Sequence, residues 1–279
     1  MDHFLALFDQ VTPTARAFFS GNLCRLAEFA GPERHGYLHI LRSGRLRLDR
    51  PGAASVTLDE PSLLFAPRHN PHSFVPDPAS GVDLVCATVE LGGDEGSPVA
   101  QSLPAMMIVP LAQVETLAPT LNLLMMEAFG ARDGRQFALD RLFEYLIVQL
   151  LRFAVAAGQV DGGVLAGLAD PRLARALTAM HEAPARHWSL DDLAGLAGMS
   201  RTRFAALFRS VVGTTPIDYL ARWRMMIAQK MLRQGKSIKA VASAVGYESP
   251  AALSRSFAKI IGVSPRAWSA RALGDQAAS

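Results

Sequence analysis

The second half of the chain contains two copies of one pattern, and this repeat constrains the fold more than any other feature. The first copy opens with Ser189, continues with apolar residues at helical spacing and reaches Gly198; the same order returns 48 residues later, from Ser237 to Gly246. Beyond each glycine, a series of Phe, Gly and Pro also recurs, at an offset of 49. The repeat predicts two equivalent structural units in sequence.

Each copy has the pattern of a helix-turn-helix. The opening serine can accept a hydrogen bond from a free backbone N–H and begin a short helix. Gly198 and Gly246 supply the left-handed backbone that ends it, and Ser200 and Ser249 are placed to cap a second helix. Between the copies, Pro216–Gln234 has the length and apolar spacing of a joining helix. Such a unit places its second helix in the DNA major groove, although a helical hairpin that binds nothing has the same pattern.

Charge is divided unevenly along the chain. Residues 1–170 carry a net charge of −7 and residues 171–279 carry +10, including all four lysines. An acidic half joined to a basic half favours a polyanionic partner for the basic half alone, against the alternative of chance clustering of solvated charge.

The first half contains short strand patterns followed by two helical ones. Between Asn22 and Leu91, turn signals separate strand-like segments at Tyr37–Leu41, Arg45–Leu48, Val56–Leu58, Leu63–Phe65 and Leu84–Val89. This spacing predicts a small antiparallel barrel or sandwich. Residues 111–158 follow as a helical hairpin, whose second helix is apolar on more than one face and must bury more than one side. The barrel, the partner helix and a second subunit can all provide that cover, or the burial is wholly within the chain.

We therefore predict an α+β protein of two domains. Residues 1–158 form a small antiparallel β-barrel with the hairpin, the glycine-rich residues 159–170 form a linker, and residues 171–272 form an all-α domain with two helix-turn-helix units.

Several motifs in this order resemble a known family. The joining segment YLARWRMMIAQKML, the block VGYESPAALSRSFAKIIGVSP and the closing RAW resemble the DNA-binding domain of AraC/XylS-type transcriptional regulators over Pro171–Arg271. The order HILRSGRLRL, DEPSLLFAPRHNPHSF is similar to the cupin-type sensor domain fused to many such regulators, over Gly21–Pro110. The resemblance implies a sequence-specific activator or repressor that binds promoter operators in double-stranded DNA. It also implies a homodimer formed through the N-terminal domain, an unidentified small-molecule effector, and RNA polymerase as a further partner.

The resemblance also assigns DNA-contacting positions. They are, in the first copy, Ser200, Arg201, Thr202, Arg203 and Arg209, and in the second copy Ser249, Ala251, Ser254, Arg255 and Lys259. Arg255 stands where the family presents a long reader, whereas its counterpart in the first copy is Ala206. Arginine can form two hydrogen bonds with a guanine edge, whereas alanine can only contact a thymine methyl. We therefore predict that the first helix-turn-helix mainly contacts phosphates, or reads bases through Thr202 and Arg203.

Other prominent side chains of the basic half are expected to be structural. Tyr219, Trp223 and Trp268 lie at helical spacing and are predicted to be core. Arg224 matches a family position in the joining helix, where it either packs within the domain or contacts DNA.

The first half also contains residues that could bind a metal. His39, His69, His72 and Cys86 are the candidates, since imidazole and thiolate suit zinc. The cupin resemblance leads one to expect three histidines and a carboxylate, but neither the His-x-His pair nor the carboxylate is present at the expected spacing. We predict hydrogen-bonded histidines and an inert thiol, with no metal, no cofactor and no enzymatic activity. The alternative is a cupin-type metal-dependent enzyme with an accessory helical domain.

The remaining sequence features concern location. Two cysteines, Cys24 and Cys86, are too few for a disulfide framework. No stretch of about 18 uncharged apolar residues is present, and the first residues lack a basic signal-peptide start. We predict a cytoplasmic protein with no membrane partner.

Overall fold

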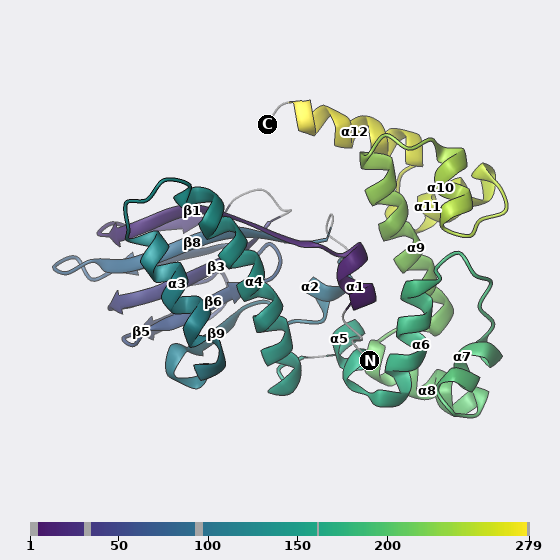
Figure 1. The fold of residues 1–279 in the computed structure, drawn as a ribbon, viewed down its shortest axis with the longest axis horizontal. Coiled ribbons are helices and arrows are strands. Elements are labelled where there is room, and N and C mark those ends of the chain that lie inside the picture. Colours follow the sequence, from purple (N-terminus) through teal and green to yellow (C-terminus); the bar gives the residue numbers. More distant parts are fainter. Residues whose placement is uncertain (1–4, 31–34, 93–96, 161, 278–279) are drawn as a thin grey trace. The chain divides into compact units, whose positions relative to one another are not determined.

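The computed structural model describes residues 5–30, 35–92, 97–160 and 162–277, and its backbone forms two compact units (Figure 1). One unit holds the described parts of residues 12–95 and 99–161; the other holds those of residues 162–279 together with 1–11 and 96–98. The second unit therefore begins inside the stretch expected to be a linker. None of the described helices is long and apolar enough to cross a membrane.

The first unit is built on two antiparallel sheets. The five-stranded sheet has the order β1 (Pro13–Leu23), β8 (Val82–Leu91), β3 (Gly36–Gly44), β6 (Ser62–Ala66), β9 (Met107–Pro110). The four-stranded sheet has the order β2 (Ala27–Phe29), β7 (His72–Pro76), β4 (Leu46–Asp49), β5 (Val56–Leu58). The five predicted strand segments all fall within these strands, except that β4 begins at Leu46. The antiparallel barrel-like prediction is confirmed.

The longest strand, β1, was not predicted as one, because we expected strands only from Asn22 onward. A bulge between Ala17 and Phe19 interrupts the alternation of buried and exposed side chains that identifies a strand. The chain at this bulge is held from outside the sheet. Asp140 accepts a hydrogen bond from the Ala17 N–H at 2.8 Å, and the Gln136 side-chain amide donates to the Ala17 carbonyl at 2.8 Å.

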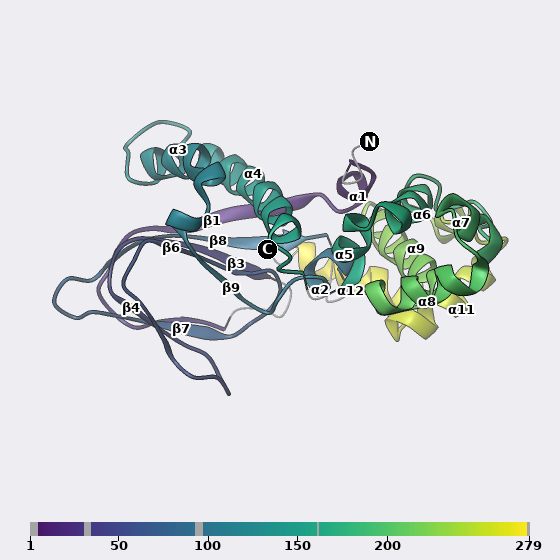
Figure 2. The ribbon, with the colours of Figure 1, turned by 90° about the horizontal axis from the view of Figure 1, so that it is seen from below.

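Two helices lie against one face of the five-stranded sheet, as Figure 2 shows. They are α3 (Ala118–Ala128), which follows two short 3₁₀ turns at Leu111–Gln113 and Glu115–Leu117, and α4 (Arg135–Ala156). The apolar residues of α4 are largely buried against β1 and α3, as its pattern requires. Leu142 and Phe153 are half-buried. The predicted hairpin is present, with its first helix shorter than the pattern suggested.

The second unit is helical. Its elements are α1 (Leu5–Gln10), α5 (Gly163–Ala169), α6 (Pro171–Glu182), α7 (Leu190–Leu196), α8 (Arg201–Val212), α9 (Pro216–Arg233), α10 (Ile238–Ala244), α11 (Pro250–Ile261) and α12 (Pro265–Ala277). The short helix α2 (Pro98–Gln101) has only its first residue in this unit and the rest in the first unit. Helix α5 lies in the expected linker and packs against α6 and α8. Gly167 permits this packing, because a Cβ there would lie 2.6 Å from Cδ1 of Leu177.

We expect the equivalent glycines of the two repeats to differ in their tolerance of alanine. Both have a left-handed backbone, with φ of 64° at Gly198 and 79° at Gly246. At Gly246 a Cβ would also lie 2.4 Å from the Ala185 carbonyl oxygen, whereas at Gly198 it would meet no atom within 4 Å. Gly198→Ala should lower the free energy of unfolding by about 1 kcal/mol through backbone strain alone, and Gly246→Ala by about 2–4 kcal/mol.

Urea titration followed by tryptophan fluorescence measures both losses, because all three tryptophans lie in the second unit. Equal losses for the two variants would show that the approach of Gly246 to Ala185 contributes nothing.

Candidate nucleic-acid interface

The first helix-turn-helix is formed by α7 and α8. Ser189 caps α7 in a reciprocal arrangement: its hydroxyl accepts from the Asp192 N–H, and the Asp192 carboxylate accepts from the Ser189 N–H. The Ser189 hydroxyl also donates to the Asp192 carboxylate at 2.6 Å, and this bond, followed by the one from the Ser189 N–H, holds the pKa of Asp192 below its usual value. Ser200 has the extended backbone of an N-cap for α8, but its hydroxyl makes no capping hydrogen bond to any described residue. The predicted cap is therefore present in backbone geometry only.

The second helix-turn-helix, α10 and α11, is capped at both helices. The hydroxyl of Ser237 accepts from the Ala240 N–H, and that of Ser249 accepts from the Ala252 N–H. Gly262 ends α11 with a φ of 84°, as Gly213 ends α8 with 82°. The repeat in sequence is thus a repeat in structure.

Each second helix presents one exposed face at corresponding positions. On α11 the face carries Ala251, Arg255 and Lys259, and all three residues are exposed. The corresponding positions on α8 are Thr202, Ala206 and Ser210, which are also exposed. One face therefore carries two cations and the other none, so the two helices are equivalent in fold and different in chemistry.

The other predicted contact residues are either exposed arginines or serines whose hydroxyls are hydrogen-bonded within their own helix. Arg203 and Arg209 are exposed on either side of the α8 face. Arg201 lies 3.6 Å from the Asp191 carboxylate, and both side chains are well exposed, so this pair is weak and can open. Ser254 is half-buried, and its hydroxyl donates to the Pro250 carbonyl within α11. Ser249 is likewise half-buried and engaged in its cap.

Arg224 packs within the domain. Its side chain is half-buried; Nε donates to the Pro184 carbonyl at 2.7 Å, and Nη2 donates to the Arg186 carbonyl at 2.9 Å. Its guanidinium carbon lies 5.7 Å from the centre of the Tyr247 ring, and burial lowers its pKa from the ordinary value. Arg224 thereby connects α9 to the loop before α7 and to the turn between α10 and α11.

An aromatic cluster packs against the buried side of α8. Phe208 of α8 contacts the Tyr219 ring, and His181 stacks on Trp223 with ring centres 4.0 Å apart. The hydroxyl of Tyr219 lies 2.6 Å from Nε2 of His181. Burial lowers the pKa of His181 to about 3 and raises that of Tyr219. Tyr219, Trp223 and Trp268 are all buried, which confirms their prediction as core.

The barrel histidines form a pair rather than a metal site. His72 Nδ1 lies 2.7 Å from the Asn70 carbonyl oxygen, so this nitrogen carries the proton and donates. His72 Nε2 is then an acceptor, and it accepts a hydrogen bond from the Nε2–H of His39 at 3.0 Å. Burial lowers the pKa of both histidines, so both rings are neutral.

The residues present do not fit a zinc ion. Among the described residues no three His, Cys, Asp or Glu side chains are grouped as ligands. Cys86 faces His39 across two paired strands, but its thiol is buried and its pKa is raised, which disfavours the thiolate that zinc requires. His69 makes no bond to the pair. Nδ1 of His39 is buried without a hydrogen-bond partner among the described residues, but two imidazoles are fewer than the three protein ligands of even an open zinc site.

Comparison with known proteins identifies relatives of both halves. A family model described as "Cupin" matches residues 2–156, and one described as "Helix-turn-helix domain" matches residues 193–271. A putative AraC-like transcription regulator of Streptomyces lividans is 37% identical over 58% of this chain and 55% of its own length. The RCS-specific HTH-type transcriptional activator RclR of Escherichia coli (strain K12) is 26% identical over 81% of each protein. The chain thus matches little more than half the length of the Streptomyces relative.

Among solved structures, the DNA-binding domain of AdpA, in complex with a target DNA, is 34% identical, with a TM-score of 0.35, and covers 37% of this chain and 92% of that one.

The buried His181 predicts a pH dependence of stability. The folded state holds this ring neutral down to about pH 3, whereas the unfolded chain protonates it below about 6.5. The stabilising effect is therefore complete above pH 6.5 and is lost as pH falls toward 3, at up to about 1.4 kcal/mol per pH unit. Urea unfolding followed by tryptophan fluorescence between pH 7 and pH 5 measures this slope.

The matched variant is His181→Phe, which keeps a ring against Trp223 and removes the titrating group. It should be less stable at pH 7, because the Tyr219 hydroxyl loses its partner, and should have a shallower slope. The same slope in both proteins would contradict the assignment.

Proposed function

Because the chain belongs to the AraC family of DNA-binding transcriptional regulators and carries an N-terminal cupin domain, we propose that it recognises a promoter operator through α8 and α11 and responds to an effector through its first unit. RNA polymerase is the partner that such a regulator would recruit or exclude. The cytoplasm is where a regulator of this kind meets DNA.

One observation carries this proposal. Two equivalent helices of a strongly basic unit each present an exposed face, and neither face is used in packing the unit. Exposed arginines and lysines that lack acidic partners are suited to phosphates and guanine edges. Arg255 and Lys259 have no ion pair among the described residues.

The two faces support different roles in recognition. The α11 face, with Arg255 at its centre, is suited to reading base edges. Of the three α8 face positions, only Thr202 and Ser210 carry hydroxyls, and that of Ser210 donates to the Leu207 carbonyl within α8. Arg203 and Arg209 flank that face, where exposed guanidinium groups would be available to phosphates. We propose that α11 supplies most of the sequence preference and α8 mainly positions the protein.

Replacing Arg255 tests this division. The operator is first obtained by sequencing the genomic fragments that the purified chain retains at near-physiological salt. Arg255→Ala should then weaken operator binding by about 1–3 kcal/mol and relax the preference at one or two base pairs. Arg175→Ala is the control, since it removes one exposed cation from α6 of the same unit.

The control variant should keep the base preference of the unaltered chain. An Arg255→Ala protein with unchanged affinity and preference would exclude α11 as the reader. Retention of all fragments alike, abolished by added salt, would indicate backbone binding without sequence recognition.

We propose further that the chain is a homodimer through its first unit. Helix α4 leaves Phe137 and Tyr145 exposed at 71% and 52%, with Arg141 between them. Residues spaced by four lie on one side of a helix, so this stripe is available to a second copy. Two copies double the DNA contacts, and an effector that alters the dimer can change which operator spacing it spans.

Light scattering tests the dimer. The double variant Phe137→Ser, Tyr145→Ser should have the mass of one 30.0 kDa chain under conditions in which the unaltered protein has twice that mass. Leu26→Ser removes an apolar residue that is 59% exposed elsewhere on the same unit and should leave the dimer intact. A monomeric unaltered chain, or a double variant that remains dimeric, would refute the assignment of this stripe.

A further inference from the structure

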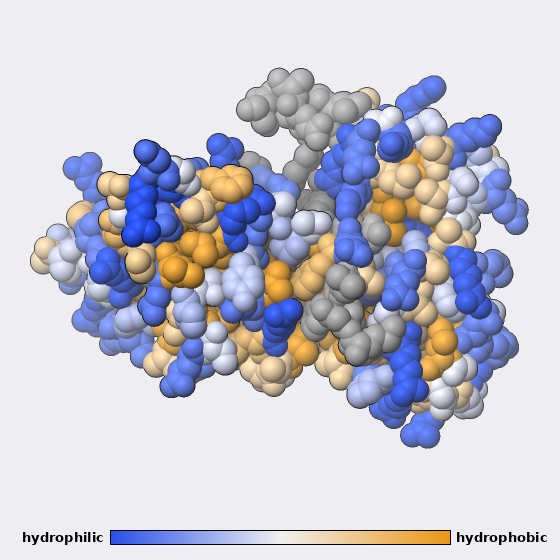
Figure 3. All heavy atoms as spheres, in the orientation of Figure 1, coloured by the Kyte–Doolittle hydropathy of each residue, from blue (hydrophilic) through white to orange (hydrophobic). Residues whose placement is uncertain are grey.

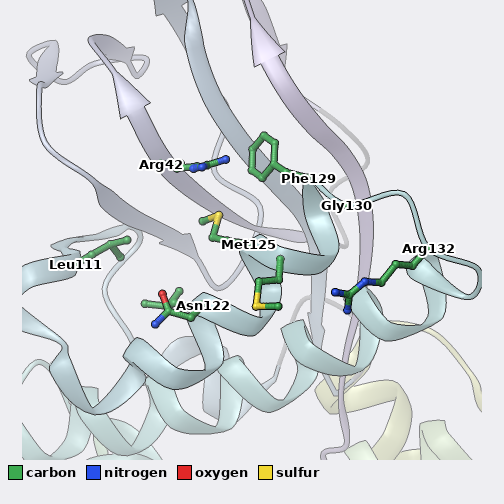
Figure 4. A pocket seen from close by; sticks show the side chains of 9 residues that line it. Arg42, Leu111, Asn122, Met125, Phe129, Gly130 and Arg132 are labelled. Atoms are coloured by element: carbon green, nitrogen blue, oxygen red, sulfur yellow. The ribbon is translucent and has the colours of Figure 1, made fainter.

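A groove lies on the first unit between helix α3 and the neighbouring end of the five-stranded sheet (Figure 4). Arg42 extends into it from β3, and Leu111 borders it just after β9. The remaining lining comes from α3 and the segment that follows it. The groove is outside the barrel, so its ligand would not need to displace the packed interior that contains His39 and His72.

The walls of the groove are apolar and adaptable. They are formed by Leu111, Leu121, Met125, Met126 and Phe129. The cavity volume is about 780 Å³, within the range of sites that bind small organic ligands. Met126 is 54% exposed and Phe129 38%, and Figure 3 shows apolar residues gathered on this side of the unit. Flexible methionines let such a wall adjust to the shape of an apolar ligand.

Two guanidinium groups border these walls. Arg42 lies over the Phe129 ring, 4.7 Å from its centre, and makes no ion pair with any described residue. A guanidinium stacked in this way keeps its N–H groups free along its edge. Arg132 lies on the other side of the groove, where its Nη1 is 3.2 Å from Glu127 Oε1. One positive charge is therefore neutralised locally and the other is not.

We propose that this groove binds a small monoanionic carboxylate with an apolar body, such as a medium-chain or aromatic acid. The apolar part would lie against Met125, Met126 and Phe129, and the carboxylate would accept hydrogen bonds from Arg42. A bidentate pair of this kind is strong and directional, and the Phe129 ring holds the guanidinium in place for it. Asn122 supplies a further polar side chain at the groove.

The charges and the shape favour this occupant over a second copy of the chain. The dimer stripe proposed above, Phe137 and Tyr145, lies on α4 and is not part of the groove lining. A single unpaired cation above a concave apolar wall matches one small anion.

As the effector site, the groove depends on the proposed regulator function; as a binding site, it does not. Its lining includes α3 and the segment that leads into α4, so an occupant would contact the hairpin assigned to dimerisation.

The test uses the full chain labelled with ¹³C at its methionine methyl groups. Sodium octanoate is the probe, octan-1-ol is the neutral match of its tail, and sodium acetate is the match of its head group. Met125→Leu and Met126→Leu each remove one methyl signal and thereby assign it. Octanoate should shift these two signals saturably, with an affinity about tenfold or more above that of octan-1-ol, and acetate should not shift them.

Two arginine variants test the charge. Arg42→Gln should weaken octanoate binding about tenfold and leave octan-1-ol binding unchanged. Arg16→Gln removes an exposed arginine from β1 and should change neither.

Three outcomes would overturn the proposal: equal affinity for octanoate and octan-1-ol, unchanged octanoate binding by Arg42→Gln, or Met125 and Met126 signals that shift with protein concentration alone, which would make a second copy the occupant. A chain that retains its operator but not octanoate refutes this inference alone, and one that binds octanoate but no operator refutes the regulator proposal alone.

Discussion

Packing along the joining helix α9 is the constraint on which the second unit depends. Helices α8, α10, α11 and α12 all contact it. Tyr219, in its first turn, meets Phe208 of the first helix-turn-helix, and Arg233, in its last turn, lies over Trp268 at the end of the second. The helix has 18 residues and is therefore about 27 Å long, comparable to the roughly 34 Å of one turn of DNA. One rigid helix thus sets the separation of the two helix-turn-helix motifs.

The relative orientation of the two helix-turn-helix motifs depends on a second set of contacts, which are made at the loop before α7. Arg224 reaches from α9 to the carbonyls of Pro184 and Arg186, and the backbone of Gly246 approaches Ala185 of the same loop. The loop thereby contacts the joining helix and the turn of the second helix-turn-helix. Since these contacts are made by Arg224, a glycine and backbone carbonyls, and by no residue of α8 or α11, the geometry leaves the exposed faces of those helices free to differ in sequence.

Much of this architecture could be predicted from the sequence, because its signals are local. Capping serines, turn glycines and helix-spaced apolar residues act within one helix or turn, so each repeat identifies itself. The strand β1 was missed because its bulge is stabilised by Asp140 and Gln136, more than 100 residues away. Helix α5 was taken for linker because its glycines suggest a loop, whereas Gly167 is there to let α5 approach Leu177.

The candidate site was likewise only partly predictable from the sequence. The exposed positions of α8 and α11 follow from the period of a helix, but hydrogen bonds decide which side chains are free. Ser249 and Ser254 were predicted as contacts from their positions, and both hydroxyls are engaged within their own unit. The contact of His39 with His72 joins strands of different sheets, so no spacing in the sequence indicates it.

Helix α5 follows the hairpin in the chain and packs on α8, one of the two helices proposed to contact DNA. Helix α4 ends at Ala156 and α5 begins at Gly163, so residues 157–162 are the connection between the hairpin and a helix that packs on α8. Six residues reach at most about 20 Å. A displacement of α4 larger than the slack in this connection must move α5 or detach it from α8. Because the buried residues Leu165 and Leu168 anchor α5, detachment exposes apolar surface, and moving α8 with α5 avoids that cost. Under the proposed function, a ligand that shifts the hairpin would act on α8 through this short chain segment and the packing of one small helix.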